Sequence, residues 1–101
     1  MLASANTPQE GVTLNVIAPL STLEVGLEGR VVEVRGAGAL RRRLLDLGFT
    51  PGATVKAVRR APLGSPTAFL VRGTVIALRP ADASTILVMT STDTGGDAQW
   101  V

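Results

Sequence analysis

Short apolar segments separated by glycine and proline turns are the feature of this sequence that most limits the folds available to it. Between Arg30 and Met89, β-branched and aliphatic residues form short runs, and turn-forming residues separate each run from the next. Because Gly and Pro favour turns and β-branched side chains suit an extended backbone, the runs predict strands. The predicted strands are RVVEV (30–34), ATVKAVRR (53–60, with room for a bulge), TAFLVRG (67–73), TVIALRP (74–80) and TILVM (85–89).

One segment follows a helical period instead. Leu40, Leu44 and Leu47 are spaced at i, i+4 and i+7, and Leu45 widens their stripe. Apolar residues at this spacing lie on one face of a helix, so the pattern predicts an amphipathic helix over about residues 38–47. Gly48 follows where a glycine ends a helix, because a left-handed backbone costs glycine little. The segment PADAS (80–84) has the proline that favours one further helical turn.

Five short strands with one inserted helix favour a small antiparallel barrel over a sandwich. Strands as apolar as TAFLV and TVIAL, joined by a tight hairpin at Gly73, would be exposed at an open sheet edge, and closing the sheet removes that edge. The expected organisation is one domain at residues 19–90, with flexible tails at 1–13 and 91–101. Trp100 is expected to be an exposed tail residue, with a role as a partner anchor as the alternative.

The absence of histidine and cysteine excludes most enzyme chemistry and most metal sites. A side-chain nucleophile needs a base beside it, and selective Fe(II) sites use imidazole or thiolate ligands. The remaining candidates, Glu24, Glu28 and Glu33, are carboxylates that would hold at most a hard cation weakly. We therefore expect no catalytic residue, no cofactor and no metal site.

No apolar run approaches the roughly 20 residues that a membrane-spanning helix needs. The first residues lack the basic segment followed by an apolar segment that marks a signal peptide. The sequence therefore predicts a cytoplasmic protein that does not insert into the membrane.

Positive charge is concentrated in the middle of the chain. Arg30 to Arg60 contains eight basic and two acidic residues, whereas the rest contains two basic and six acidic residues. Arg41, Arg42 and Arg43 lie in the first half of the predicted helix, where cations oppose the helix dipole. Three interpretations stay open: their heads lie in water or on strand-end carbonyls, they dock on an acidic partner, or they bind nucleic acid. With two Phe and one Trp, the chain offers few groups for base stacking, which argues against nucleic acid.

The segment APLGSP (61–66) predicts a loop, because it contains two prolines and a glycine. Leu63 is expected at its tip, either exposed for contact with a partner or another copy of the chain, or folded back onto the core. Phe49, just past the helix, is expected to line an apolar cleft near Leu47, between the helix and the barrel.

Several co-linear motifs resemble the FeoA family, small cytoplasmic proteins of bacterial ferrous-iron uptake. Leu23, Gly26 and Gly29 match its L-x-x-G-x-x-G pattern. Three longer blocks match in register: GALRRRLLDLGFTPG through Arg43, Leu44, Leu47, Gly48, Pro51 and Gly52; VRRAPLGSP through Ala61, Pro62, Leu63, Gly64 and Pro66; VRGTVIALRPADA through Gly73, Leu78, Arg79, Asp82 and Ala83. Ser65 stands where the family loop usually has Asp, and Leu47 where Met is frequent. The order and spacing of the motifs over residues 19–90 make the resemblance specific.

The resemblance implies a small five-stranded SH3-like antiparallel barrel with one inserted α-helix, acting beside the membrane ferrous-iron transporter FeoB. The implied role is docking on the transporter's cytoplasmic GTP-binding region, which would hold the protein at the inner face of the membrane. Because related domains form part of some iron-responsive repressors, a regulator-type interaction module is the alternative. From the charge, the loop and the resemblance together, the residues expected to contact the partner are Arg41, Arg42, Arg43, Leu47, Phe49, Pro62, Leu63 and Gly64.

Overall fold

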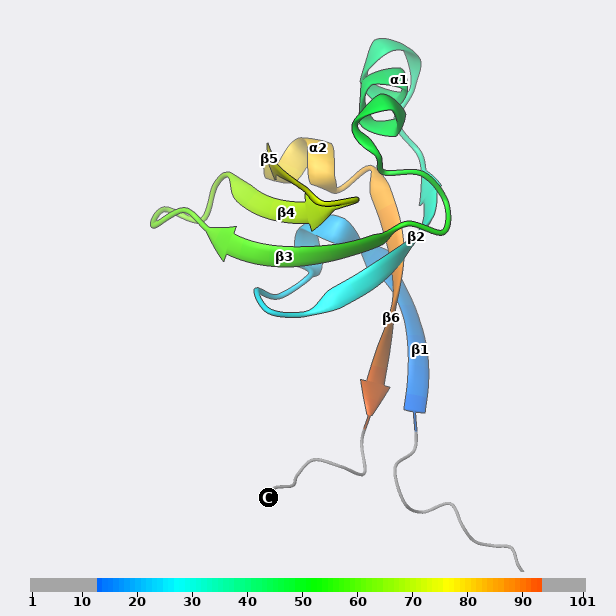
Figure 1. Ribbon diagram of the computed structural model, residues 1–101, viewed down its shortest axis with the longest axis vertical. Coiled ribbons are helices and arrows are strands. Elements are labelled where there is room, and N and C mark those ends of the chain that lie inside the picture. Colours follow the sequence, from blue (N-terminus) through cyan, green and yellow to red (C-terminus); the bar gives the residue numbers. More distant parts are fainter. Residues whose placement is uncertain (1–12, 94–101) are drawn as a thin grey trace, which may run out of the picture.

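The computed structural model describes residues 13–93, in which six antiparallel strands form one curved sheet (Figure 1). The strand order across the sheet is β1-β6-β2-β3-β4-β5. In chain order the elements are β1 (Thr13–Pro19), the 3-10 turn η2 (Leu20–Thr22), β2 (Glu28–Val34), α1 (Gly38–Leu47), β3 (Thr54–Arg60), β4 (Thr67–Val71), β5 (Thr74–Leu78), α2 (Pro80–Ala83) and β6 (Ile86–Asp93). The predicted mainly β antiparallel fold, with its helix at 38–47 and a helical turn after Pro80, is confirmed.

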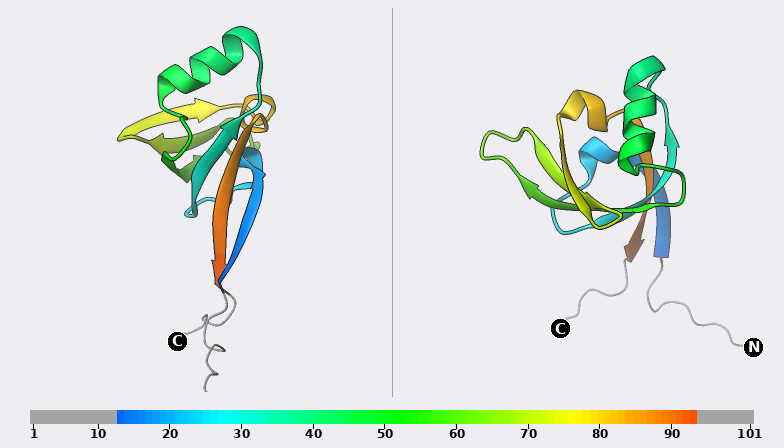
Figure 2. Two further views of the ribbon diagram at one scale, coloured as in Figure 1. Left: turned by 90° about the vertical axis from the view of Figure 1, so that its right-hand side faces the viewer. Right: turned by 45° about the horizontal axis from the view of Figure 1, so that its top comes forward.

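The strand β1 was not predicted, so the sheet has six strands instead of the five expected. β1 pairs with β6 over its whole length, from Thr13 opposite Asp93 to Pro19 opposite Leu87. Residues 91–93, expected in the C-terminal tail, are the last residues of β6. Small polar residues interrupt the apolar ones in β1 and follow them at the end of β6, which hid β1 and the last residues of β6 from the sequence analysis. Together β1 and β6 form a ribbon that extends away from the rest of the sheet (Figures 1 and 2).

The sheet curls toward a barrel, but the complete closure that we expected is absent, since β1 and β5 are its two edges. Register irregularities between Val31 and Glu33 and between Ala57 and Arg59 bend β2 and β3, and the second is the bulge for which the sequence left room. The turn η2, which follows β1, contacts α2, which follows β5. These two short helices therefore meet at the ends of the two edge strands, β1 and β5.

A single apolar core lies between the curved sheet and the helices. Its largest fully buried side chains are those of Phe49, Phe69, Leu20, Leu44, Ile86, Val31, Val55, Val71 and Val88. Leu40 and Leu45 of α1 pack against this core, as the helical period of the sequence predicts. The core fixes how α1 sits on the sheet, and thereby which of its side chains face solvent.

The helix α1 ends at Gly48 in a Schellman motif. Gly48 has a φ of 115°, and its N–H donates to the carbonyl oxygen of Leu45 at 3.1 Å. The N–H of Phe49 donates to the carbonyl oxygen of Leu44, also at 3.1 Å. The predicted helix-ending glycine is confirmed, and the motif directs Phe49 back toward Leu44 in the core.

Replacing Gly48 with alanine is expected to lower the free energy of unfolding by about 1–2 kcal/mol, because a residue with a Cβ is strained in the left-handed conformation. The added Cβ would also lie 3.3 Å from Cδ of Arg72. Thermal unfolding followed by circular dichroism measures the loss. Gly36→Ala is the matched control, since Gly36 lies outside the left-handed region and its Cβ would meet nothing closer than 3.5 Å. Equal losses in the two variants would contradict the role given to Gly48.

Candidate partner-binding surface

The exposed face of α1 carries the arginine cluster. Leu40 and Leu44 pack toward the core, which leaves Arg41 and Arg42 on the solvent side of the helix. The Nε of Arg41 donates to the carbonyl oxygen of Val34, the last residue of β2, at 3.2 Å. One arginine head therefore lies on a strand-end carbonyl, which was the first of the three interpretations of the cluster.

The other two arginines of the cluster differ in how they are held. The Nη2 of Arg43 lies 3.6 Å from Oδ2 of Asp82 in α2, and both side chains are partly exposed, so this pair contributes little to stability. No hydrogen bond or ion pair to another residue between 13 and 93 holds Arg42. Within the described chain, Arg42 is thus the member of the cluster whose guanidinium is uncommitted.

A hollow of about 270 Å³ lies on α1 beside these arginines, lined by Gly38, Arg41, Arg42, Leu45 and Asp46. Leu45 supplies apolar surface, and Arg41 and Arg42 supply positive charge and hydrogen-bond donors. Such a combination suits a protein surface that presents carboxylates beside an apolar side chain. The sequence analysis placed Leu45 only on the buried apolar face of the helix. Leu45 lies at the edge of that face, and this position in the sequence indicated that its side chain could also reach the surface.

The expectation for Phe49 is wrong. Its side chain is fully buried, so it forms part of the core and does not line a surface cleft. The physical reason is the Schellman motif, which turns the chain inward directly after the helix. Leu47 is 38% exposed and remains available for contact.

The loop between β3 and β4 presents Leu63 to solvent. The N–H of Gly64 donates to the carbonyl oxygen of Ala61 at 2.7 Å, and the N–H of Ala61 donates to that of Pro66 at 3.0 Å, so the loop is internally braced. Leu63 is 97% exposed, which settles the two alternatives for this residue in favour of an exposed tip. Pro62 and Gly64 are exposed on either side of it.

The predicted contact residues divide into two separate places. The helix α1 leads into the start of β3, whereas the loop follows its end, and the seven residues of β3 span roughly 20 Å at the usual rise per residue. Both views confirm that α1 and this loop lie on different sides of the molecule (Figures 1 and 2). The structure therefore does not combine the arginines and Leu63 into one continuous patch.

Arg72 is a positioning residue that the sequence analysis missed. It lies in the β4–β5 turn, where its Nη2 donates to Oγ1 of Thr50 at 2.7 Å and its Nε donates to the carbonyl oxygen of Gly48 at 3.4 Å. These contacts tie the turn to the segment that follows α1. The available signal in the sequence was a basic residue directly before the hairpin glycine. In the structure this residue has a positive φ of 51°.

Other kinds of site find little support in residues 13–93. This part of the chain contains no group of three or more His, Cys, Asp or Glu that could hold a metal ion. Both phenylalanines are buried, so no described aromatic side chain is available to stack on a nucleic-acid base. No helix among the described residues is long and apolar enough to cross a membrane.

Comparison with known proteins matches the FeoA domain model to residues 18–90. The chain belongs to the FeoA family. A curated relative, the Fe(2+) transport protein A/Fe(2+) transporter FeoB fusion protein of Porphyromonas gingivalis, is 38% identical over 69 residues, which cover 68% of this chain and 8% of the fusion protein. The chain thus spans only a small part of the length of that relative.

Solved structures of FeoA proteins have the same fold. The iron(II) transport protein A of Clostridium thermocellum matches with a TM-score of 0.69 at 33% identity, covering 71% of this chain and 44% of that one. The zinc complex of Stenotrophomonas maltophilia FeoA, described as an SH3 domain protein, matches with a TM-score of 0.66 at 31% identity, covering 73% of this chain and 94% of that one. The SH3-like fold expected from the resemblance is confirmed.

Proposed function

We propose that this FeoA protein is a non-enzymatic, cytoplasmic accessory of bacterial ferrous-iron uptake that docks on the GTP-binding region of a FeoB-type transporter through the exposed face of α1. The observation that carries the proposal is the Porphyromonas gingivalis relative, which joins both proteins in one chain. Joining two proteins covalently raises the effective concentration of each at the other, which favours even a weak contact between them. A protein that acts by binding another protein needs an exposed contact surface and does not need a catalytic side chain.

The positions of the chain ends fit such an arrangement. Thr13 lies opposite Asp93 in the β1–β6 register, so both ends of the described chain are adjacent. They lie at the end of the ribbon that points away from α1 (Figures 1 and 2). A connection made from either end therefore leaves α1 and the β3–β4 loop uncovered.

The chemistry of α1 indicates what the partner surface must offer. Arg42 is uncommitted among the described residues, and the hollow beside it combines guanidinium groups with the apolar surface of Leu45. Guanidinium groups pair with carboxylates in a planar geometry with two parallel hydrogen bonds. We therefore expect an acidic patch on the GTP-binding region, with Leu63 as a second, separate contact.

Titration of the isolated GTP-binding region of a FeoB transporter with this protein tests the proposal. We expect measurable binding by calorimetry at low ionic strength, and weaker binding as salt is added, because exposed charge pairs are screened. Binding that does not respond to salt would contradict the arginine-mediated contact. Absence of binding at low salt would remove the proposed partner, and salt-sensitive binding to DNA or RNA instead would favour the nucleic-acid alternative.

A further inference from the structure

The strand β5 is an outer edge of the sheet that lacks the usual protection against pairing with another chain. β4 pairs with one side of it, and no strand among residues 13–93 pairs with the other side. Its sequence, TVIAL, contains no charged residue and no proline, and its register with β4 is continuous. Natural proteins usually protect their edge strands with charges, prolines or bulges. The edge of β5 is therefore favourable for the addition of a further strand.

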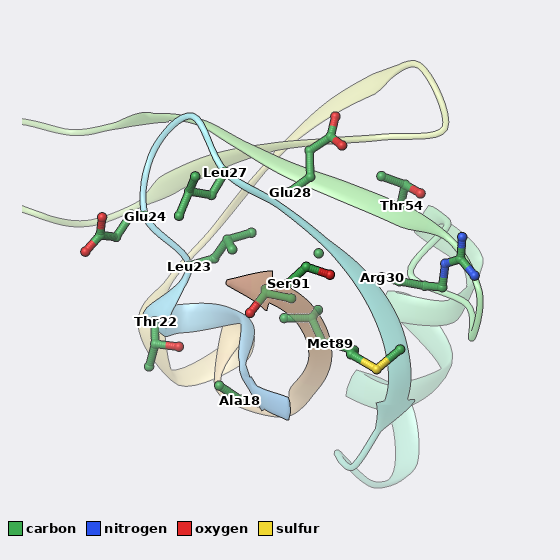
Figure 3. A pocket seen from close by; sticks show the side chains of 13 residues that line it. Ala18, Thr22, Leu23, Glu24, Leu27, Glu28, Arg30, Thr54, Met89 and Ser91 are labelled. Carbon is green, nitrogen blue, oxygen red and sulfur yellow. The ribbon is translucent and has the colours of Figure 1, made fainter. Parts of the chain in front are cut away.

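The other open edges of the sheet differ from β5. The outer edge strand β1 includes an asparagine and ends at a proline, residue types that disfavour strand addition. β6 pairs with β2 only as far as Met89, so its last residues have no partner on that side within the described chain. Beside that stretch lies a cleft of about 580 Å³ whose lining includes Glu24, Glu28 and Arg30 (Figure 3). Charged side chains beside an edge disfavour pairing with another chain, so β5 is the least protected of the three edges.

The tight hairpin between β4 and β5 determines which backbone groups of β5 point outward. Its loop has two residues, both at positive φ, so Val71 and Thr74 on either side of the loop form a hydrogen-bonded pair. Such pairs alternate along an antiparallel ladder, so the N–H and C=O groups of Val75 and Ala77 point away from β4. No other backbone group in residues 13–93 forms a hydrogen bond with them. These groups are available to an added strand.

The side chains on the outer face of this edge are apolar and accessible. Val75 is 59% exposed, and Ala77 is also exposed. Val75 lies opposite Leu70 of β4, which is partly exposed, so the apolar surface extends across both strands. The charged residues in the same two rows, Lys56 and Arg59, lie on β3, one strand further from the edge. An added strand would therefore meet free backbone groups and apolar side chains.

We infer that the occupant of this edge is β5 of a second copy of the chain, paired antiparallel about a two-fold axis at Ile76. In this register Val75 lies opposite the second copy's Ala77, and Thr74 lies opposite the second copy's Leu78. Each Val75 then exchanges both backbone hydrogen bonds with an Ala77 of the other copy, so the outward groups of both strands are satisfied. A shift of two residues in either direction would leave only one hydrogen-bonded pair of strand residues.

The same register separates the positive charges that flank β5. Arg79 lies opposite the second copy's Gly73, and Arg72 lies opposite the second copy's Pro80. Like charges directly opposite each other destabilise a pair of strands, and this register places no arginine opposite another. The edge is therefore complementary to itself, as an interface with two-fold symmetry requires, and this property assigns it to a second copy.

The size of the interface indicates that the association is weak. Each copy contributes a strand of five residues, compared with the roughly 20–30 residues that each partner contributes to a stable interface. We therefore expect a dimer that forms at high protein concentration and dissociates on dilution. Both ends of the described chain lie at the far end of the β1–β6 ribbon, away from β5 (Figure 1). The inference does not depend on the proposed function, and its test needs no transporter.

Sedimentation equilibrium over a wide range of protein concentrations tests the pairing. We expect the average mass to rise with concentration from the 10.4 kDa of one chain toward twice that value, and not beyond it. A mass that stays at one chain up to millimolar protein would overturn the inference and leave the edge to a different protein. Larger assemblies would also overturn it, because pairing of β5 with β1 of the next copy does not close and continues to add chains.

Ala77→Pro is the direct test of the edge, because it removes an outward N–H and none of the N–H groups that bond to β4. We expect association about tenfold to a hundredfold weaker, since each copy loses one donor, while circular dichroism shows that the sheet is retained. Val75→Lys is the second variant if the proline variant does not fold, and it places a charge diagonal to the second copy's Arg79.

Ile17→Lys is the matched control, since Ile17 is 57% exposed on the other edge strand, β1. It should leave the association unchanged. Equal weakening by Ile17→Lys and Val75→Lys would show an effect of net charge, and weakening by Ile17→Lys alone would place the second copy at β1. Either result would contradict pairing through β5.

Amide hydrogen exchange identifies the residues that pair. The amides of Val75 and Ala77 should become several-fold better protected as protein concentration rises, whereas those of Thr74 and Ile76, which bond to β4, should not change. Protection of Val75 and Ala77 that is the same at all concentrations would mean that a segment of the same chain covers the edge. A dimer in which these two amides stay unprotected would place the second copy elsewhere, so either finding would reject the inference.

Discussion

Replacing Phe49 with alanine is expected to destabilise the protein by about 3–5 kcal/mol, the usual cost of removing a buried phenylalanine ring. Phe49 is fully buried among the core residues. Its backbone N–H also closes the Schellman motif on Leu44, so the ring is held where the helix ends. A loss of this size is a large part of the total stability of a chain of about 100 residues.

Urea unfolding followed by circular dichroism measures this loss, with Phe49→Leu as a milder variant if the alanine variant does not fold. Leu63→Ala is the matched control, because Leu63 is 97% exposed and its replacement should change stability by no more than about 0.5 kcal/mol. A Phe49→Ala protein of unchanged stability that binds its partner less well would restore the surface role expected from the sequence.

The contrast between Phe49 and Gly48 shows which parts of the fold could be predicted from the sequence. The stripe of Leu40, Leu44 and Leu47 gives the helix, because its period depends only on local geometry. Gly48 gives its end, because the left-handed conformation favours glycine locally. The burial of the Phe49 side chain depends on how the chain turns back toward Leu44 after the helix. Schellman motifs often include an apolar contact between residues at these two positions, and this tendency was the one sequence indication that Phe49 is buried.

Neither the strand β1 nor the separation of the predicted contact residues into two places could be predicted from local sequence patterns. β1 exists because β6 offers it a pairing partner about 70 residues away in the chain, and its mixed polar and apolar residues carry no strong local preference. The arginine cluster and Leu63 were both expected to contact the partner, and they lie near opposite ends of β3. The helix α1 precedes β3 and the loop follows it, so both are close to β3 in the sequence although they lie at its opposite ends.

Replacing Arg42 with glutamate is expected to weaken binding to the GTP-binding region of FeoB by about tenfold to a hundredfold, or about 1.4–2.8 kcal/mol. The reversal places a negative charge against the acidic patch that the proposal requires. Because no described residue holds Arg42, the variant should keep its stability, unlike a change at Arg41, whose Nε donates to the carbonyl oxygen of Val34. Calorimetric titration measures the affinity, and thermal unfolding checks the fold.

Lys56→Glu is the matched control, since it changes the net charge equally on β3, where Lys56 pairs in register with Glu28 at the far end of β2 from α1. If both variants weaken binding alike, the effect is one of net charge and α1 is not the docking face. Leu63→Ser in the same titration then tests the loop as a second contact. Because the loop and α1 lie roughly 20 Å apart along β3, the effects of Arg42→Glu and Leu63→Ser should add if both touch the same partner. An unaltered affinity in Arg42→Glu would show that Arg42 does not contact this partner, and the docking face would have to be sought elsewhere on the molecule.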